Sequence, residues 1–279
     1  EETHELRLPE ITALQEAYVR KVIDTVNDLD NVLYEISNES HRESPQWQYH
    51  MIRHIRQYES TKPQRHPIGM TVPWPDGANS ALFASPADWV SPNGSITERP
   101  IARGAKVIVA DTDHLCGRCG DAAWVWRSFT AGENPVFMDP YDRSTYVSGD
   151  PKERDVDDPQ WVAVRRNLGY VLEMSRRIDL RRTVPAPDLA SSGHCLADTG
   201  GAKPVYVVYL AGKREVAVDL SRSPEETVLS IEWLDIRTGQ TVTGGTARGG
   251  ALRTFHSPLA GDGVLVLDVR SPGAAALVR

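Results

Sequence analysis

The chain has 279 residues, of which 40% are hydrophobic and 25% charged, and its formal net charge at pH 7 is −7. This composition is typical of a folded globular protein with one large domain or two smaller ones. The negative charge argues against nucleic acid as the main partner, because phosphate binding needs clustered Lys and Arg. No stretch reaches the roughly 18 consecutive apolar residues of a membrane-spanning helix, so we expect no membrane partner.

The first part of the chain alternates between predicted helices and predicted strands. The helices have apolar residues at steps of three or four, and the strands are short apolar runs. The predicted helices are residues 11–28, 45–60, 124–129 and 158–182, and the predicted strands are 31–36, 66–72, 87–90, 106–110 and 135–138. Strands that alternate with helices predict βα units and a parallel sheet.

The predicted strands end in polar residues rather than in tight hairpins, which is typical of a (β/α)₈ barrel, whose chemistry lies at the carboxyl ends of its strands. A whole barrel needs about 250 residues, and fewer precede the next change of pattern. We therefore expect an α/β fold with a partial TIM barrel. The missing part, upstream of Glu1 or in another chain, would cover the open edge of the sheet.

The pattern changes at residues 183–187, where two prolines and the loss of periodicity predict a linker. Beyond it, short runs rich in Val and Leu predict strands at 205–210, 215–220, 228–233 and 263–269. Such strands, separated by turns, indicate a small antiparallel β-sandwich. The sequence thus predicts two domains, residues 1–184 and 188–279.

The first predicted strand is followed by Asn38 and Glu39. An unpaired carboxylate is costly to bury, so an acidic residue at the end of a strand needs a partner or a function. Glycosidases use two carboxylates that flank the scissile bond, one of them protonated so that it donates to the leaving oxygen. Glu39 is therefore a candidate for one of these two carboxylates, and its alternative role is a carboxylate near the start of the next helix.

The pair Asn38-Glu39 resembles the Asn-Glu pair at the end of strand four in the large retaining clan of barrel glycosidases. Further runs resemble apiosidase-like glycoside hydrolases of the DUF4038 type, which end in a domain of the collagen-binding type, over nearly the whole chain. These runs are Val109-Ala110-Asp111-Thr112-Asp113-His114-Leu115, Gly120-Asp121 with Trp124-Val125-Trp126, and Asn134-Pro135-Val136-Phe137-Met138-Asp139-Pro140-Tyr141.

This resemblance implies that the five predicted strands are strands four to eight of the barrel. It implies Glu39 as acid/base and Asp111 as nucleophile, with Asp113 as the alternative, where the clan usually has Glu. Because Asp is shorter, the choice between a retaining separation of about 5 to 5.5 Å and an inverting one of about 6.5 to 9.5 Å stays open. The candidate substrate contacts are Asn38, His41, Asp88, Trp89, His114, Asp139 and Tyr141.

The expected function is hydrolysis of O-glycosidic bonds in a plant or microbial polysaccharide, in an extracellular or periplasmic location. The alternative is a non-catalytic module that binds carbohydrate or protein, and a third possibility is that the sandwich only stabilises the barrel. The odd number of cysteines leaves at least one unpaired. Cys116 and Cys119 lack the second pair of a zinc site, so we interpret them as loop thiols and predict neither metal nor cofactor.

Overall fold

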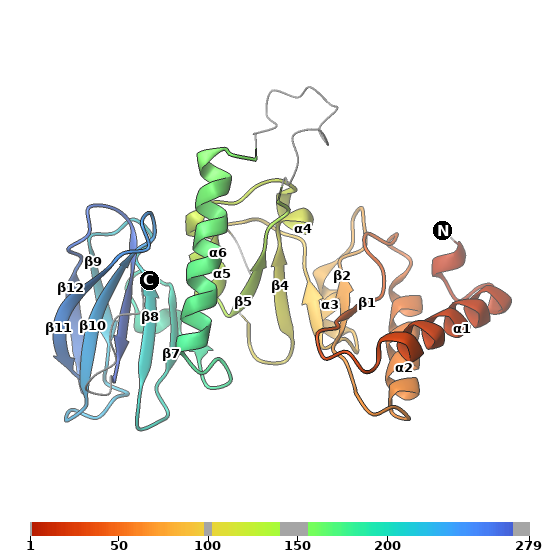
Figure 1. The fold of residues 1–279 in the computed structure, drawn as a ribbon, viewed down its shortest axis with the longest axis horizontal. Helices are drawn as coiled ribbons and strands as arrows, with labels where there is room; N and C mark the ends of the chain where they lie inside the picture. The colour runs from red at the N-terminus through yellow and green to blue at the C-terminus, as the bar shows by residue number, and fades with distance from the viewer. Residues whose placement is uncertain (1, 98–101, 140–155, 270–279) are drawn as a thin grey trace. The chain divides into compact units, whose positions relative to one another are not determined.

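The computed structural model describes residues 2–97, 102–139 and 156–269 (Figure 1). The chain divides into two compact units, the first made of residues 1–94 and 104–115 and the second of 95–103 and 116–279. Within the described ranges, no helix is both long enough and apolar enough to span a membrane.

The first unit alternates helices and strands as the sequence predicts. Its elements are α1 (Pro9–Val26), β1 (Tyr34–Glu35), α2 (Pro45–Glu59), β2 (Ile68–Thr71), α3 (Asn79–Ala84), β3 (Trp89–Ser91) and β4 (Val107–Asp111), followed by α4 (Thr112–Cys116). Each of the strand pairs β1–β2, β2–β3 and β3–β4 is parallel. The carboxyl ends of these strands therefore lie at one edge of the sheet, the edge that carries chemistry in α/β folds.

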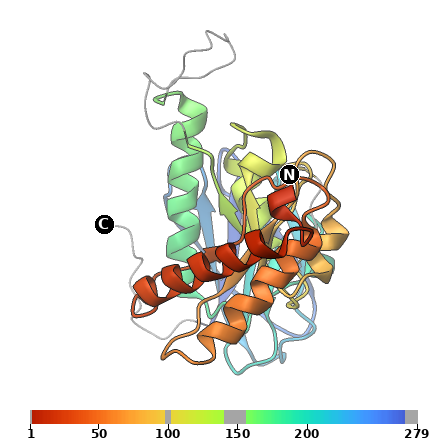
Figure 2. The ribbon, with the colours of Figure 1, turned by 90° about the vertical axis from the view of Figure 1, so that its right-hand side faces the viewer.

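Helices α1 and α2 pack side by side, as Figure 2 shows. Gln15 accepts a hydrogen bond from Trp47 at 2.9 Å, and further along both helices Asp24 accepts one from Tyr58 at 2.9 Å. The contacts advance in the same direction on both helices, so the helices run parallel. The apolar face of α2, with Trp47, Met51, Ile52 and Ile55, is buried.

A buried polar cluster ties the end of α2 to the start of β2. His66 Nδ1 lies 2.7 Å from Glu59 Oε1, and the His66 amide donates to Glu59 Oε2 at 2.9 Å. The other ring nitrogen lies 2.8 Å from the Leu29 carbonyl oxygen, so both polar ends of the imidazole have partners. The carboxylate raises the pKa of His66 by hydrogen bonding, against the opposing effect of burial.

The second unit begins with α5 (Ala122–Thr130), β5 (Glu133–Val136) and α6 (Pro159–Arg177). Its later strands are β6 (Val184–Pro185), β7 (Cys195–Asp198), β8 (Val205–Tyr209), β9 (Glu215–Asp219), β10 (Val228–Asp235), β11 (Thr241–Arg248), β12 (Leu252–His256) and β13 (Gly263–Asp268). Six of them form an antiparallel sheet in the order β11-β10-β13-β8-β7-β6, and β12 pairs with β9.

The six-stranded sheet has a hydrophobic core on each face. In β13, Leu265 and Leu267 belong to the core shared with β9 and β12, whereas Val264 and Val266 belong to the core shared with α5 and α6. This alternation follows from the two-residue period of a strand. Trp124, Trp126 and Trp161 fill the helix side.

The predicted linker at 183–187 is wrong. Val184 and Pro185 form β6, which pairs with β7 at the edge of the six-stranded sheet, and the 3₁₀ helix Pro187–Leu189 follows directly. Proline is compatible with this position because an edge strand has one side without a ladder. The change from parallel strands to antiparallel ones is confirmed, and the domains 1–184 and 188–279 stay a prediction.

Candidate functional site

The candidate site lies in the first unit, at the carboxyl ends of β1 to β4. Four polar side chains meet there from segments that are far apart in the sequence. They are Asn38 after β1, Thr71 at the end of β2, Ser91 at the end of β3 and His114 after β4. The parallel order of the strands is the physical reason, because it gathers the βα connections at one edge.

His114 joins three of these segments. Its Nε2 lies 3.0 Å from Asn38 Oδ1, and its Nδ1 lies 2.7 Å from Ser91 Oγ. An amide oxygen only accepts hydrogen bonds, so Nε2 of His114 is the donor, and in the neutral ring Nδ1 accepts from the Ser91 hydroxyl. The Asn38 oxygen is thus engaged, and its NH₂ group is oriented by this chain of bonds.

Thr71 holds the segment after β1 against the end of β2. Its hydroxyl lies 2.9 Å from the Ser37 carbonyl oxygen and 3.2 Å from Glu35 Oε1. Ser37 in turn accepts a hydrogen bond from Ser40, whose carbonyl oxygen accepts from the Trp74 amide at 2.8 Å. Residues on both sides of Glu39 are therefore fixed to neighbouring segments.

Glu39 itself has a backbone φ of +47°, in the left-handed region that favours glycine. Its side chain is exposed. A non-glycine residue held in this region stores strain, and such residues cluster at functional sites. The anchored neighbours explain how the strain is maintained. Asp76, another exposed carboxylate of this unit, also has a left-handed backbone, with a φ of +62°.

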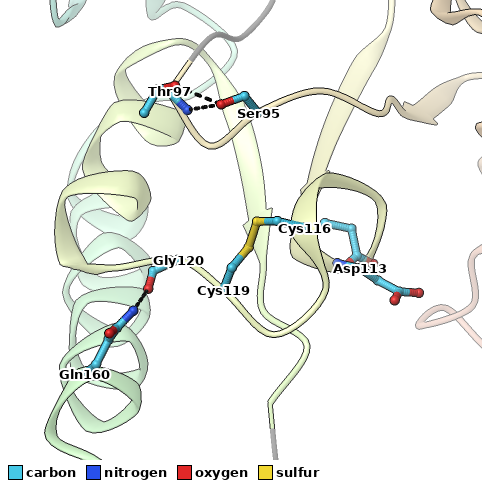
Figure 3. Close-up of a disulfide and its surroundings, with 8 residues drawn as sticks. Ser95, Thr97, Asp113, Cys116, Cys119, Gly120 and Gln160 are labelled. Carbon is cyan, nitrogen blue, oxygen red and sulfur yellow. Dashed lines mark hydrogen bonds between the residues drawn. A yellow bond between two sulfur atoms is a disulfide. The ribbon is translucent and has the colours of Figure 1, made fainter. Parts of the chain in front are cut away.

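The two predicted aspartates after β4 differ in their contacts. Asp111 ends β4, and its Oδ1 accepts a hydrogen bond from the Asp113 amide at 2.9 Å, which caps the start of α4. Asp113 lies in the first turn of α4, with its side chain pointing away from the Cys116–Cys119 disulfide (Figure 3). Both are half-buried. One oxygen of Asp111 therefore has a structural role, whereas the Asp113 side chain accepts no comparable hydrogen bond from the residues that the structure describes.

Asp88 and Trp89 are not brought to this edge. The sequence placed Asp88 and Trp89 at the end of the third strand. In the structure this strand runs from Trp89 to Ser91, so both residues stand at its beginning. Asp88 Oδ2 accepts from the Ile68 amide at 3.0 Å, and its Oδ1 pairs with Arg56. A Cβ at Gly69 would lie 1.9 Å from the Trp89 ring, so Trp89 packs over this glycine.

The remaining predicted contacts also lie elsewhere or beyond the described residues. Asp139 forms a two-pronged ion pair with Arg165 of α6, at 2.7 and 2.6 Å, in the second unit. His41 follows Glu39 closely, and its ring stacks at 6.4 Å on that of His4. Tyr141 lies outside the described residues.

The prediction of two loop thiols is wrong. Cys116 and Cys119 form a disulfide, shown in Figure 3, and their Cα atoms are 5.9 Å apart, within the usual range for a disulfide. Cys195 is free and buried. In the part of the chain that the structure describes, no group of three or more His, Cys, Asp or Glu side chains is arranged to hold a metal.

Thr71 and Ser91 were not predicted from the sequence. Each is the polar residue that directly ends an apolar strand, after Met70 and Val90 respectively. The rule that selected Asn38 and His114 would have found both, if the strand ends had been placed correctly.

No protein family and no curated protein matches the sequence. Among solved structures, a glycoside hydrolase is similar with a TM-score of 0.63 and 12% identity, over 92% of this chain and 68% of its own. A family 5 glycoside hydrolase from Bacteroides vulgatus has a TM-score of 0.66 and 12% identity, over 92% and 66%. A family 30 subfamily 8 xylanase from Clostridium acetobutylicum has a TM-score of 0.52 and 14% identity, over 94% of this chain and 73% of its own.

The chain thus has a glycoside-hydrolase-like fold and spans about two thirds of the length of these structures.

Proposed function

We propose that this chain is part of a glycoside hydrolase that cleaves O-glycosidic bonds with two carboxylates. The observation that supports this most directly is the bridge from Asn38 through His114 to Ser91, because it joins the segments after β1, β3 and β4. Glu39 is adjacent to Asn38, and Asp113 is adjacent to His114. The bridge therefore draws the two candidate carboxylate segments to one edge of the sheet.

In this proposal Glu39 is the general acid/base, which protonates the leaving oxygen. The second carboxylate is Asp111 or Asp113. The contacts favour Asp113, because one Asp111 oxygen is occupied in capping α4. Asn38 offers its amide hydrogens to a substrate hydroxyl, and Ser91 and His114 act as positioning residues for Asn38. The substrate class we propose is a plant or microbial polysaccharide.

The resemblance to apiosidase-like enzymes of the DUF4038 type belongs to the same proposal. It would make β1 to β5 the last five strands of a barrel. The antiparallel strands β6 to β13 would then form a β-sandwich of the collagen-binding type. β1 has one described neighbour, β2. Strands that complete the barrel would lie beside β1, supplied by the same gene product or by another chain.

The test uses the natural full-length protein and a panel of polysaccharides, with release of reducing ends as the measurement. Glu39→Gln keeps the shape of the side chain but removes its proton transfer, so activity should fall about 10²- to 10⁴-fold. Glu43→Gln is the matched control, since Glu43 is a nearby exposed residue whose side chain pairs with Arg42. Binding of a glycan without cleavage, unchanged by Glu39→Gln, would replace the hydrolase with a binding module.

A further inference from the structure

A second candidate site lies within the second unit, in a cavity of about 170 Å³. Its walls include Arg127, Thr130 and Ala131 from the end of α5, Pro185 and Pro187, and His194 just before β7. The volume is slightly larger than the roughly 150 Å³ of a protein cavity that accommodates benzene. The cavity can therefore hold one six-membered ring.

Arg127 lines this cavity with a guanidinium. Its side chain is 26% exposed, and its Nε is buried with no hydrogen-bond partner within the described ranges. Asp121 Oδ1 lies 3.7 Å from Nη2, too far for a hydrogen bond, and already accepts from the Trp124 amide at 2.6 Å. The exposed part of the guanidinium can meet a ligand, and a carboxylate offers the two oxygens that match a guanidinium.

His194 adds a polar group of a different kind. Its ring contacts that of Tyr209 at a centroid distance of 5.7 Å. Burial lowers the pKa of His194, and the positive charges of Arg127 and Lys213 lower it further. The ring is therefore neutral near pH 7, and a neutral imidazole has one donor and one acceptor, which suits a hydroxyl group.

The other walls are apolar or accept hydrogen bonds. Pro185, Pro187 and Ala131 present C–H surfaces, which suit the face of a sugar ring. The Thr130 hydroxyl donates to the Trp126 carbonyl oxygen at 2.8 Å, so its oxygen remains an acceptor. The cavity thus combines a cation, hydroxyl-binding groups and an apolar wall.

We propose that this cavity binds an acidic monosaccharide unit, a hexuronate. Its carboxylate pairs with Arg127, its hydroxyls meet His194 and Thr130, and its C–H face packs on Pro185 and Pro187. The proposal does not depend on the hydrolase function, because these residues belong to the second unit and Glu39, Asp111 and Asp113 to the first.

The experiment is a calorimetric titration of the full chain with sodium glucuronate, with glucose and acetate as probes that lack the carboxylate or the ring. We expect saturable binding of glucuronate, and at least about tenfold weaker binding of glucose and of acetate. Arg127→Gln should weaken glucuronate binding about 10- to 100-fold. The matched control is Arg181→Gln, since the Arg181 side chain is 89% exposed and pairs with Asp179.

Arg127→Lys keeps the charge but not the two-pronged geometry, so it should bind less tightly than the wild type and provides the test if Arg127→Gln does not fold. Equal binding of glucose and glucuronate, equal binding of acetate, absence of saturable binding, or unchanged affinity in the Arg127 variants would each overturn the proposal. Glu39→Gln should leave glucuronate binding intact, so failure of the hydrolase proposal can be told apart from failure of this one.

Discussion

At the scale of single residues, Glu39, the proposed general acid/base, has a strained backbone. The left-handed conformation costs a non-glycine residue about 1–2 kcal/mol. Its neighbours Ser37, Asn38 and Ser40 each accept an ordinary hydrogen bond from an adjacent segment, donated by Thr71, His114 and the Trp74 amide respectively. A residue that stores strain and is selected for function should be replaceable by a more stable but inactive one.

We therefore predict that Glu39→Gly stabilises the protein and abolishes hydrolysis. Glycine relieves the strain but loses about 0.5–1 kcal/mol of conformational entropy on folding, so the free energy of unfolding should rise by about 0.5–1 kcal/mol. Urea unfolding measures this free energy. Ala211→Gly is the control, because Ala211 has a φ of +53° and lies in the other unit, so it should gain stability without losing activity. A less stable Glu39→Gly protein would mean that the backbone is not strained there.

The buried pair of His66 and Glu59 makes stability depend on pH. Its hydrogen bond raises the pKa of His66 above the unfolded value of about 6.5. The stabilisation is thus fully present below about pH 6.5 and is lost as pH rises through the folded pKa. The stability difference between wild type and His66→Gln, measured by urea unfolding, should shrink between pH 6 and pH 9. A difference that stays constant over this range would contradict the charged pair.

At the scale of elements, the sequence predicted long periodic segments well. Helices α1 and α2 and strands β8, β9, β10 and β13 lie within a few residues of their predicted bounds. Helix α3 was missed because its six residues are too few to show a helical period. Strand β11 was missed because it is largely exposed and contains Gly244 and Gly245, which are unfavourable in strands.

The same limits explain what was missed at the candidate site. Asn38 and His114 could be predicted because a polar residue follows an apolar run in each case, and the structure brings the two together. Asp88 and Trp89 were misplaced because the third strand begins and ends later than predicted, at Trp89 and Ser91. A shift of one or two residues in a three-residue strand moves a side chain from one edge of the sheet to the other.

The disulfide at the end of α4 gives a prediction for the cysteines. Cys116 and Cys119 are paired, and burial raises the pKa of Cys195 to about 12, so its thiolate is scarce near neutral pH. A thiol reagent should detect no thiol in the native protein, one after unfolding, and three after unfolding with reductant. Two or three reactive thiols without reductant would contradict the disulfide.

At the scale of the whole molecule, the core on the helix side of the six-stranded sheet joins residues on both sides of the predicted domain boundary. Trp124, Trp126 and Trp161 precede residue 184, and Val207 and Val264 follow it. Sequence periodicity could assign an apolar face to α5 and α6, but it could not tell which sheet that face would cover.

We predict that residues 1–187 alone do not form a native fold. Removal of the sheet would expose three buried tryptophans, each of which buries roughly 150–250 Å². The fragment should aggregate or bind a hydrophobic dye, whereas the intact chain, prepared in the same way, should not. A soluble fragment with the near-ultraviolet dichroism of the intact chain would show that the helices are stable without the sheet.

The central claim is that Glu39 donates a proton to the leaving oxygen of a glycoside. The most direct measurement compares kcat/KM of the natural protein and of Glu39→Gln on two substrates with the same sugar, a polysaccharide and an aryl glycoside with an acidic leaving group. A nitrophenolate departs without protonation, so we predict a loss of about 10²- to 10⁴-fold on the polysaccharide and a much smaller loss on the aryl glycoside. An equal loss on both substrates, or no loss on the polysaccharide, would contradict this role for Glu39.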